Sequence, residues 1–334
     1  MKQLIALKLG STMTTIFKQG EGLVLKEPSM IAISGSLKSL EVKAVGKEAK
    51  RMQGRIGGST SVVYPINNGV ITDSELATAM LKLFLKKIFP RKFFKPNIKA
   101  ILCTPLGINL KERKTFEKVC YNAGIADVTI IPAIICSAVG DDIPVNTNNG
   151  KLLVNIGGGT TNIAVMAMNN IISGINISIG GTSIDKAVEN LVAEKFNIRL
   201  GEGIAQKIKE EVLSLLESDT ASIEVQGINI TTKENESKII TSKDIYPVAT
   251  YYYGKIAEAI LGVINTCPPD IINDIKHEGL YLFGSNSEVN GIAKFYKNKL
   301  GINVITYDHN RTDIIGAAKI LDNPTQYQEL LKSI

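Results

Sequence analysis

Two similar segments, half a chain apart, most constrain the fold of this sequence. Residues 7–12 read Leu-Lys-Leu-Gly-Ser-Thr, and residues 154–161 read Val-Asn-Ile-Gly-Gly-Gly-Thr-Thr. Each is an apolar strand that ends in a turn of glycine and hydroxyl residues, and a second apolar strand follows each turn. The repeat predicts two β-hairpins in a duplicated protein of two lobes with a cleft between them. A length of 334 residues, about two average domains, agrees with this.

Turn-bounded strands alternate with helical patterns along the chain, which predicts an α/β fold. The expected strands are residues 4–9, 30–34, 100–104, 128–131, 152–156, 163–168, 280–283 and 304–307. The expected helices are one that starts at Thr72 with Glu75 in capping-box spacing, 109–123 ended by Gly124, one opened by Gly180 and Gly181, 204–216, and 245–265. The polar stretch 231–242 is expected to be a solvent-exposed insertion.

Composition and charge exclude several classes of protein. With 44% hydrophobic and 21% charged residues, the chain has the composition of a folded globular protein. No apolar run approaches the roughly 18 residues of a membrane span, and Lys8 interrupts the only apolar stretch near the start, so we expect no signal peptide and a cytoplasmic location. A net charge of +6 is weaker than the clustered basicity of a nucleic-acid binder, so nucleic acid is not an expected partner. The four cysteines lack metal-ligand spacing and are expected to be reduced core residues; no metal-binding residues are predicted.

The glycine-rich segment 157–161 is the sharpest local motif. Glycines let backbone N–H groups approach phosphate oxygens closely, and threonine hydroxyls can add hydrogen bonds. A plain glycine-rich hairpin turn would have the same residues, so this segment alone leaves both interpretations open. The matching turn at 10–12 favours phosphate binding, because two such hairpins can clamp one polyphosphate. Gly180 and Gly181 add a helix N-terminus as a third set of donors.

In these motifs the chain resembles the actin-like ATPase superfamily and, within it, the MreB family of bacterial actins. The resemblance covers nearly the whole chain in order: the hairpins, residues 20–29, 45–50, 69–73, 180–181, 201–211 and 282–285. It implies a two-lobed actin-like ATPase fold around a nucleotide cleft, with lobe I at 1–150 (small subdomain about 30–75) and lobe II at 151–334 (small subdomain about 182–243). It also implies ATP or ADP in the cleft and filaments formed by self-association.

The resemblance also assigns nucleotide contacts. The hairpins that contain residues 7–12 and 154–161 would hold the phosphates. One face of the helix 204–216 would meet the ribose and adenine, and a loop after the strand 280–283 would meet the adenine. The residues are Gly10, Ser11, Thr12, Met13, Thr14, Gly157, Gly158, Gly159, Thr160, Thr161, Gly181, Gln206, Lys209, Glu210, Gly284, Ser285, Asn286 and Ser287. Without the resemblance, Gln206, Lys209 and Glu210 would be interpreted as a solvated polar stripe.

Three departures from the family pattern remove carboxylates. Lys8 and Asn155 stand where the family has aspartates near the metal, and Pro132 falls where it has the glutamate that polarises the attacking water. We therefore predict no intact catalytic set, weakened Mg²⁺ binding with the nucleotide, and weak or absent ATP hydrolysis. Asp73 could substitute, although it more simply supports a helix N-terminus. Lys8 could compensate phosphate charge directly, or could point away from the nucleotide.

Aromatic and basic residues alternate in the segment 89–96, between a helix and the next strand. Phe93 and Phe94 could enter a membrane interface while Arg91, Lys92 and Lys95 meet anionic headgroups. The alternative is that both phenylalanines begin a core strand; prolines on both sides favour a protruding loop.

These observations together predict an MreB-like cytoskeletal protein that forms filaments on the inner face of the cell membrane and governs cell shape or movement. Paralogous filament proteins are candidate partners. One alternative is a catalytically competent ATPase that uses unfamiliar residues. Another is a chaperone-type ATPase or sugar kinase of the same fold, but no substrate-binding domain is expected after Ile334 and no substrate carboxylate is recognisable.

Overall fold

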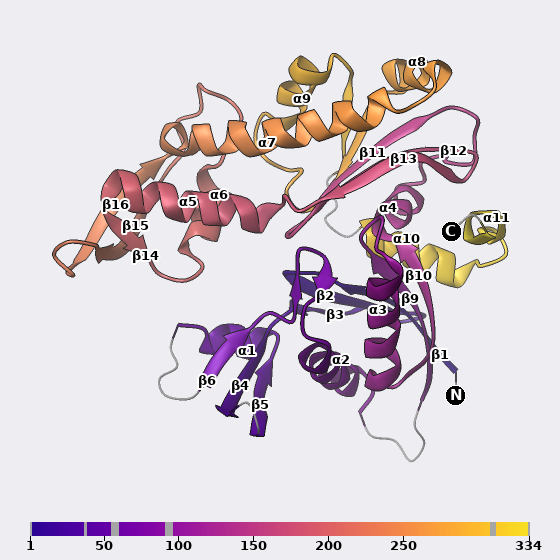
Figure 1. The fold of residues 1–334 in the computed structure, drawn as a ribbon, viewed down its shortest axis with the longest axis horizontal. Coiled ribbons are helices and arrows are strands. Elements are labelled where there is room, and N and C mark those ends of the chain that lie inside the picture. The colour runs from indigo at the N-terminus through magenta and orange to yellow at the C-terminus, as the bar shows by residue number, and fades with distance from the viewer. Residues whose placement is uncertain (1, 37–38, 55–59, 91–95, 308–311, 333–334) are drawn as a thin grey trace. The chain divides into compact units, whose positions relative to one another are not determined.

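Two five-stranded sheets, each containing one of the repeated segments, organise the computed structural model of this protein (Figure 1). The structure describes residues 2–36, 39–54, 60–90, 96–307 and 312–332. Contacts divide the chain into two compact units. Unit 1 is Met1–Asn148, Met166–Asn176 and Arg311–Ile334, and unit 2 is Asn149–Val165 and Ile177–Asn310. The lobes predicted at 1–150 and 151–334 are continuous stretches, whereas these units are not, and the lobe boundary remains a prediction.

The main sheet of unit 1 has the strand order β10-β9-β1-β2-β3. Strand β1 pairs parallel with β9 and antiparallel with β2. Side chains of β1 alternate between two faces, as expected for a strand with both faces covered. Ile5, Leu7 and Leu9 enter a core with helices α2 and α3, whereas Lys8 points to the opposite face, toward α10. The bounds are β1 Lys2–Leu9, β2 Met13–Lys18, β3 Gly22–Pro28, β9 Asn97–Thr104, β10 Ile125–Pro132, α2 Ser74–Ile88, α3 Leu110–Ala123, α4 Ala133–Gly140 and α10 Thr312–Asp322.

Helices α4 and α10 pack closely because glycines stand where they meet. A Cβ atom at Gly316 of α10 would lie 1.7 Å from the carbonyl oxygen of Cys136 in α4. The remaining elements of unit 1 are a small sheet, a short hairpin and two short helices. They are β4 Ile31–Ser36, β5 Ser39–Val45, β6 Thr60–Val63, β7 Ile66–Asn67, β8 Val70–Ile71, α1 Lys47–Met52 and α11 Gln328–Lys332.

The second five-stranded sheet has the order β13-β12-β11-β17-β18. Within unit 2, the core joins β11 and β17 to helices α5, α6 and α7, and buries the ring of Tyr253. A three-stranded sheet, β14-β15-β16, packs against α5 and α6 (Figure 1). The bounds are β11 Lys151–Ile156, β12 Thr161–Ala167, β13 Asn170–Ile177, β14 Ile198–Leu200, β15 Ser222–Asn229, β16 Asn235–Thr241, β17 Leu280–Phe283, β18 Val304–Thr306, α5 Gly181–Phe196, α6 Ile204–Val212, α7 Ser242–Asn265, α8 Pro269–Glu278 and α9 Ile292–Leu300.

The α/β fold predicted from the sequence is confirmed, and each expected strand is present with ends shifted by at most three residues. Helix α3 has the predicted limits, with Asn109 in a capping box and Gly124 in the left-handed conformation at φ 107°. The four cysteines are buried and unpaired, as expected. No helix among the described residues has both the length and the hydropathy of a membrane span.

Three local predictions were wrong. The cap of α2 is Asp73 rather than Thr72, because the Asp73 carboxylate accepts the amides of Glu75 and Leu76. Helix α6 ends at Val212 instead of residue 216. The polar stretch 231–242 contains β16, which pairs with β15 and places Ile240 in the core, so it is not simply an insertion.

Candidate functional site

Hairpin 1, formed by β1, the turn 10–12 and β2, is closed by a hydrogen bond inside its turn. The amide of Gly10 donates to the carbonyl of Met13 at 3.1 Å. A Cβ atom at position 10 would lie 2.8 Å from that carbonyl oxygen, closer than real side chains approach. The turn is also held from outside, because Ser11 Oγ accepts the amide of Gly69 at 2.8 Å. Glycine at this position is therefore a requirement of the turn.

Hairpin 2, formed by β11, the turn 157–160 and β12, repeats this geometry in unit 2. The amide of Gly157 donates to the carbonyl of Thr160 at 2.8 Å, and a Cβ atom on Gly157 would lie 3.1 Å from the same oxygen. The carbonyls of Gly157 and Gly158 accept the amides of Gly181 and Thr182 at 3.0 and 2.8 Å. The amide of Gly181, which the sequence suggested as a phosphate donor together with Gly180, is thus occupied within the fold, as is that of Thr182.

Two of the hydroxyls assigned to phosphate are also bonded within the fold. Thr14 Oγ1 lies 2.9 Å from Ser29 Oγ, and Thr161 Oγ1 donates to the carbonyl of Ile179 at 2.7 Å. Both threonines are fully buried. The donors that remain are in the turns themselves. In the described part of the chain no backbone acceptor is bonded to the amides of Ser11, Thr12, Gly158 or Gly159.

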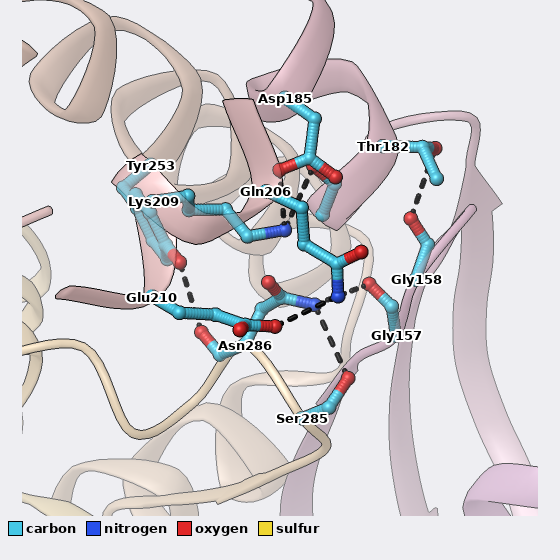
Figure 2. A network of polar contacts seen from close by, with 11 residues as sticks. Gly157, Gly158, Thr182, Asp185, Gln206, Lys209, Glu210, Tyr253, Ser285 and Asn286 are labelled. Carbon is cyan, nitrogen blue, oxygen red and sulfur yellow. Dashed lines mark hydrogen bonds and ion pairs between the residues drawn. The ribbon is translucent and has the colours of Figure 1, made fainter. Parts of the chain in front are cut away.

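The predicted ribose- and adenine-contacting face of α6 forms a hydrogen-bonded network in which Gln206 and Glu210 are exposed (Figure 2). Gln206 Nε2 donates to Glu210 Oε1 at 2.8 Å. Lys209 Nζ lies 2.7 Å from Asp185 Oδ1 and 3.2 Å from the carbonyl of Gly181, and its side chain is only 11% exposed. Burial raises the pKa of Asp185, the ion pair with Lys209 opposes this rise, and the charge of Glu210 adds to it. Lys209 is therefore held at the start of α5, beside hairpin 2.

The loop 284–287 holds hairpin 2 in place. Asn286 Nδ2 donates to the carbonyl of Gly157 at 2.9 Å, and the amide of Asn286 donates to the carbonyl of Ile156 at 3.2 Å. Tyr253 in turn donates its hydroxyl to the carbonyl of Asn286 at 2.9 Å (Figure 2). Ser287 is buried and donates to the carbonyl of Gly284 at 2.6 Å, whereas Ser285 is exposed. Of these residues, Ser285 is the one best placed to meet a ligand.

The three positions where the sequence lacks acids occupy strand ends. Pro132 ends β10 and precedes α4, and Asn155 is buried near the end of β11, opposite Phe283. Lys8 forms an ion pair with Asp313 of α10. Burial by itself lowers the pKa of Lys8, but the Asp313 carboxylate outweighs it, so the pKa lies above its ordinary value. Neither a proline, an amide nor a protonated lysine can accept a proton from water.

Within the described ranges, no side-chain cluster near the hairpins could hold Mg²⁺ by itself. The described residues contain no group of three or more His, Cys, Asp or Glu side chains that could hold a metal ion. Magnesium is normally bound through carboxylates and phosphate oxygens. At hairpin 1 the carboxylate of Asp313 is instead engaged by an ammonium group. The donor set therefore does not fit a protein-held Mg²⁺ ion.

Sequence reasoning missed Asp185, Thr182, Tyr253 and Asp313. Their partners lie between 24 and 305 positions away along the chain, so no local spacing connects them. Only the position of Asp185, in the first turns of a helix opened by two glycines, could have drawn attention to it. The predicted membrane segment, Arg91 to Lys95, lies outside the described residues.

Two sheets that each carry the same glycine hairpin define an actin-like protein, and comparisons with known structures agree. The structure of MreB5 of Spiroplasma citri bound to ADP matches with a TM-score of 0.90 at 25% identity, over 98% of both chains. The same protein bound to AMPPNP matches equally well, at 26% identity over 98% of both chains. The double helical filament of MamK shares the fold, with a TM-score of 0.79 at 17% identity, over 96% of this chain and 99% of MamK.

Sequence comparison gives the family. The MreB/Mbl protein family matches residues 2–329. The cell shape-determining protein MreB of Escherichia coli strain K12 is 31% identical over 324 residues, which cover 95% of this chain and 93% of that protein. The chain belongs to the MreB/Mbl family of cell shape-determining cytoskeletal proteins. The predicted family and fold are confirmed.

Proposed function

We propose that this chain binds ATP or ADP through hairpin 1, hairpin 2 and the exposed ends of the α6 network, and that it hydrolyses ATP slowly or not at all. The observation that carries this proposal is the shared geometry of the two turns. Each closes with the same hydrogen bond and leaves two successive amides without a backbone acceptor among the described residues. Successive free amides in glycine turns bind phosphate oxygens. The ADP- and AMPPNP-bound structures of MreB5 support a nucleotide as the ligand.

Slow hydrolysis follows from the side chains near the turns. Attack of water on a phosphoryl group needs a residue that orients the water or accepts its proton, and loss of such a base costs about 10² to 10⁴ in rate. Pro132 and Asn155 cannot do this, and Lys8 is paired with Asp313. Binding depends on backbone amides, which these substitutions leave intact, so binding and turnover are separable in this chain.

In this proposal, copies of the chain assemble into filaments, and the two predicted lobes together form the filament subunit. Membership of the MreB/Mbl family and the shared fold with the MamK filament support self-association. Paralogous filament proteins are further candidate partners.

Peripheral binding to the inner face of the cell membrane is the remaining part of the proposal. It rests on the sequence of Arg91, Lys92, Phe93, Phe94 and Lys95, in which cations flank an aromatic pair. Each cation near an anionic surface contributes about 1 kcal/mol. The variant Phe93→Ser/Phe94→Ser should reduce cosedimentation with anionic liposomes without abolishing filaments. Unchanged cosedimentation would remove this segment from the proposal.

Nucleotide binding is tested by titrating the purified chain with ADP in a calorimeter. Gly10→Ala places a methyl group 2.8 Å from a backbone oxygen and should weaken ADP binding by about tenfold or more. The matched control is Gly254→Ala in α7, where a Cβ atom meets nothing within 4 Å. Equal ADP affinity in both variants, or no binding by the wild type, would contradict the proposal.

A further inference from the structure

A charged pair lies beside hairpin 1, inside unit 1. Lys8 extends from the face of β1 that is turned toward α10, and its partner Asp313 is in the first turn of that helix. The Lys8 side chain runs along the turn, because its Cε lies 3.8 Å from the place that a Cβ atom on Gly10 would occupy. The ammonium is thus fixed next to the turn in which the amides of Ser11 and Thr12 have no backbone acceptor among the described residues.

The two side chains of the pair differ in how many of their hydrogen-bonding atoms already have a partner. Both oxygens of Asp313 are engaged, Oδ2 by Lys8 and Oδ1 by the amide of Ile314 at 2.7 Å. Lys8 has three donor hydrogens, and Asp313 is the acceptor observed for one of them. Further acceptors can therefore bind only on the lysine side of the pair.

The exposed fractions of the two side chains also indicate that a ligand would meet Lys8. The Lys8 side chain is 32% exposed, whereas that of Asp313 is 6% exposed. Solvent, or a ligand, therefore meets the positive end of the pair. Since a buried ammonium without a partner would be costly, Asp313 is what allows a cation to be held at this depth.

A polyphosphate on this turn needs positive charge, which a divalent cation usually supplies. The described residues contain no cluster of three or more His, Cys, Asp or Glu side chains that could hold such an ion, and Lys8 would repel one placed at its ammonium. An ammonium can itself bond phosphate oxygens as a compact point charge. We propose that Lys8, tethered by Asp313, is the fixed cation of hairpin 1 and balances the charge of a nucleotide phosphate there in place of a protein-held divalent cation. This inference rests on the nucleotide binding proposed above.

The test is ADP affinity with and without Mg²⁺, measured by calorimetry on the full chain in excess MgCl₂ and in excess EDTA. The wild type should change by less than about threefold between the two buffers. The double variant Lys8→Met/Asp313→Asn removes both charges without leaving either one buried alone. It should bind ADP about tenfold more weakly in EDTA than the wild type, because a charge-assisted hydrogen bond is lost.

Two further variants sharpen the test. Lys8→Arg keeps the positive charge and should keep affinity in EDTA. The matched control is Lys99→Met/Asp127→Asn, which removes another Lys–Asp pair at the opposite end of the same sheet, joined at 2.6 Å. Its ADP affinity should equal that of the wild type in both buffers. Thermal unfolding shows whether each variant is folded. The comparison of wild-type ADP affinity in MgCl₂ and in EDTA tests the inference even where a variant does not fold.

The outcomes separate this inference from the proposed function. Wild-type ADP binding that falls more than about tenfold in EDTA overturns the role of Lys8 and leaves nucleotide binding standing. The inference is also overturned if the folded double variant binds ADP in EDTA as tightly as the wild type does. Absence of ADP binding in both buffers overturns the proposed function, and this inference with it.

Discussion

Hairpins 1 and 2 have the same turn but are held by different chemistry. In each, the first glycine amide bonds the carbonyl three residues later, at 3.1 Å in hairpin 1 and 2.8 Å in hairpin 2. Two residues before that glycine stands Lys8 in one hairpin and Asn155 in the other. Hairpin 1 lies beside an ion pair that its own residue Lys8 makes to α10. Hairpin 2 is held by neutral bonds from α5 and Asn286, and the ion pair beside it joins Lys209 of α6 to Asp185 of α5.

The difference shows which part of a duplicated glycine turn is constrained. The same backbone bond closes the turn in both units, and in the proposed function this geometry leaves two amides for a ligand. The surroundings are interchangeable, provided that each buried polar group has a partner. Loss of acidic side chains at both turns is therefore compatible with an intact pair of hairpins.

The largest effect is expected where α10 meets α4, because α10 carries the partner of Lys8. Gly316→Ala would place a methyl group 1.7 Å from the Cys136 carbonyl and force the helices apart. We expect a loss of about 3 kcal/mol in the free energy of unfolding, with unit 1 affected first. Urea unfolding measures it. Gly262→Ala, in open space on α7, is the control and should cause no loss; equal stability of the two variants would contradict the close packing.

The next effect concerns charge at hairpin 1. Lys8→Met leaves the buried Asp313 carboxylate without its cation and should cost about 2–3 kcal/mol, less than for a fully buried pair because Lys8 is partly exposed. Adding Asp313→Asn should restore at least about 1 kcal/mol, since an amide is cheaper to bury than a charge. Additive losses in urea unfolding of the double variant would show that the two side chains are not coupled.

A smaller effect is expected at hairpin 2, where the bonds are neutral. Asn286→Ala removes the donor to the Gly157 carbonyl and should cost about 1–2 kcal/mol. Glu288→Ala, two residues later on an exposed side chain, serves as the control. A loss for Asn286→Ala as large as that for Lys8→Met would mean that the two hairpins do not differ in the way described.

The smallest effect tests a hydroxyl near hairpin 1. Thr104 Oγ1, at the end of β9, is buried and has no hydrogen-bond partner within the described structure. Thr104→Val should therefore leave stability unchanged or raise it by up to about 1 kcal/mol. Thr161→Val at hairpin 2 should lower stability by about 1 kcal/mol, because that hydroxyl donates to Ile179. The melting temperature of Thr104→Val should therefore be equal to or above that of the wild type, and that of Thr161→Val should be below it.

Local patterns were enough to predict most of the fold. Apolar segments bounded by turn residues located the strands. Asn109 with Gly124 defined the ends of α3, because caps act through neighbouring residues. The start of α2 was misplaced by one residue because Thr72 and Asp73 can both cap a helix. Strand β16 was missed because its residues 235–238 are polar and Ile240 is the only buried residue of the strand, whereas Ile239 is exposed.

The candidate site was less predictable, for a physical reason. The glycines of both turns are visible in the sequence because the turn itself requires them. Lys8 and Asp313 are 305 positions apart, and only the packing of α10 on the sheet joins them. Likewise, nothing local shows that Lys209 is bonded to Asp185, or that the first amides of α5 are already used by hairpin 2.

The most direct test of separable binding and turnover is a single-turnover assay. Purified chain in excess over radiolabelled ATP is incubated with MgCl₂, and bound nucleotide and released phosphate are followed together; Pro132→Glu/Asn155→Asp is run in parallel. We expect the wild type to retain ATP bound and intact, and the double variant to release phosphate faster, by a factor of about 10² if a base is restored. Rapid release of one phosphate per bound ATP by the wild type would contradict the claim that this chain binds nucleotide without effective hydrolysis.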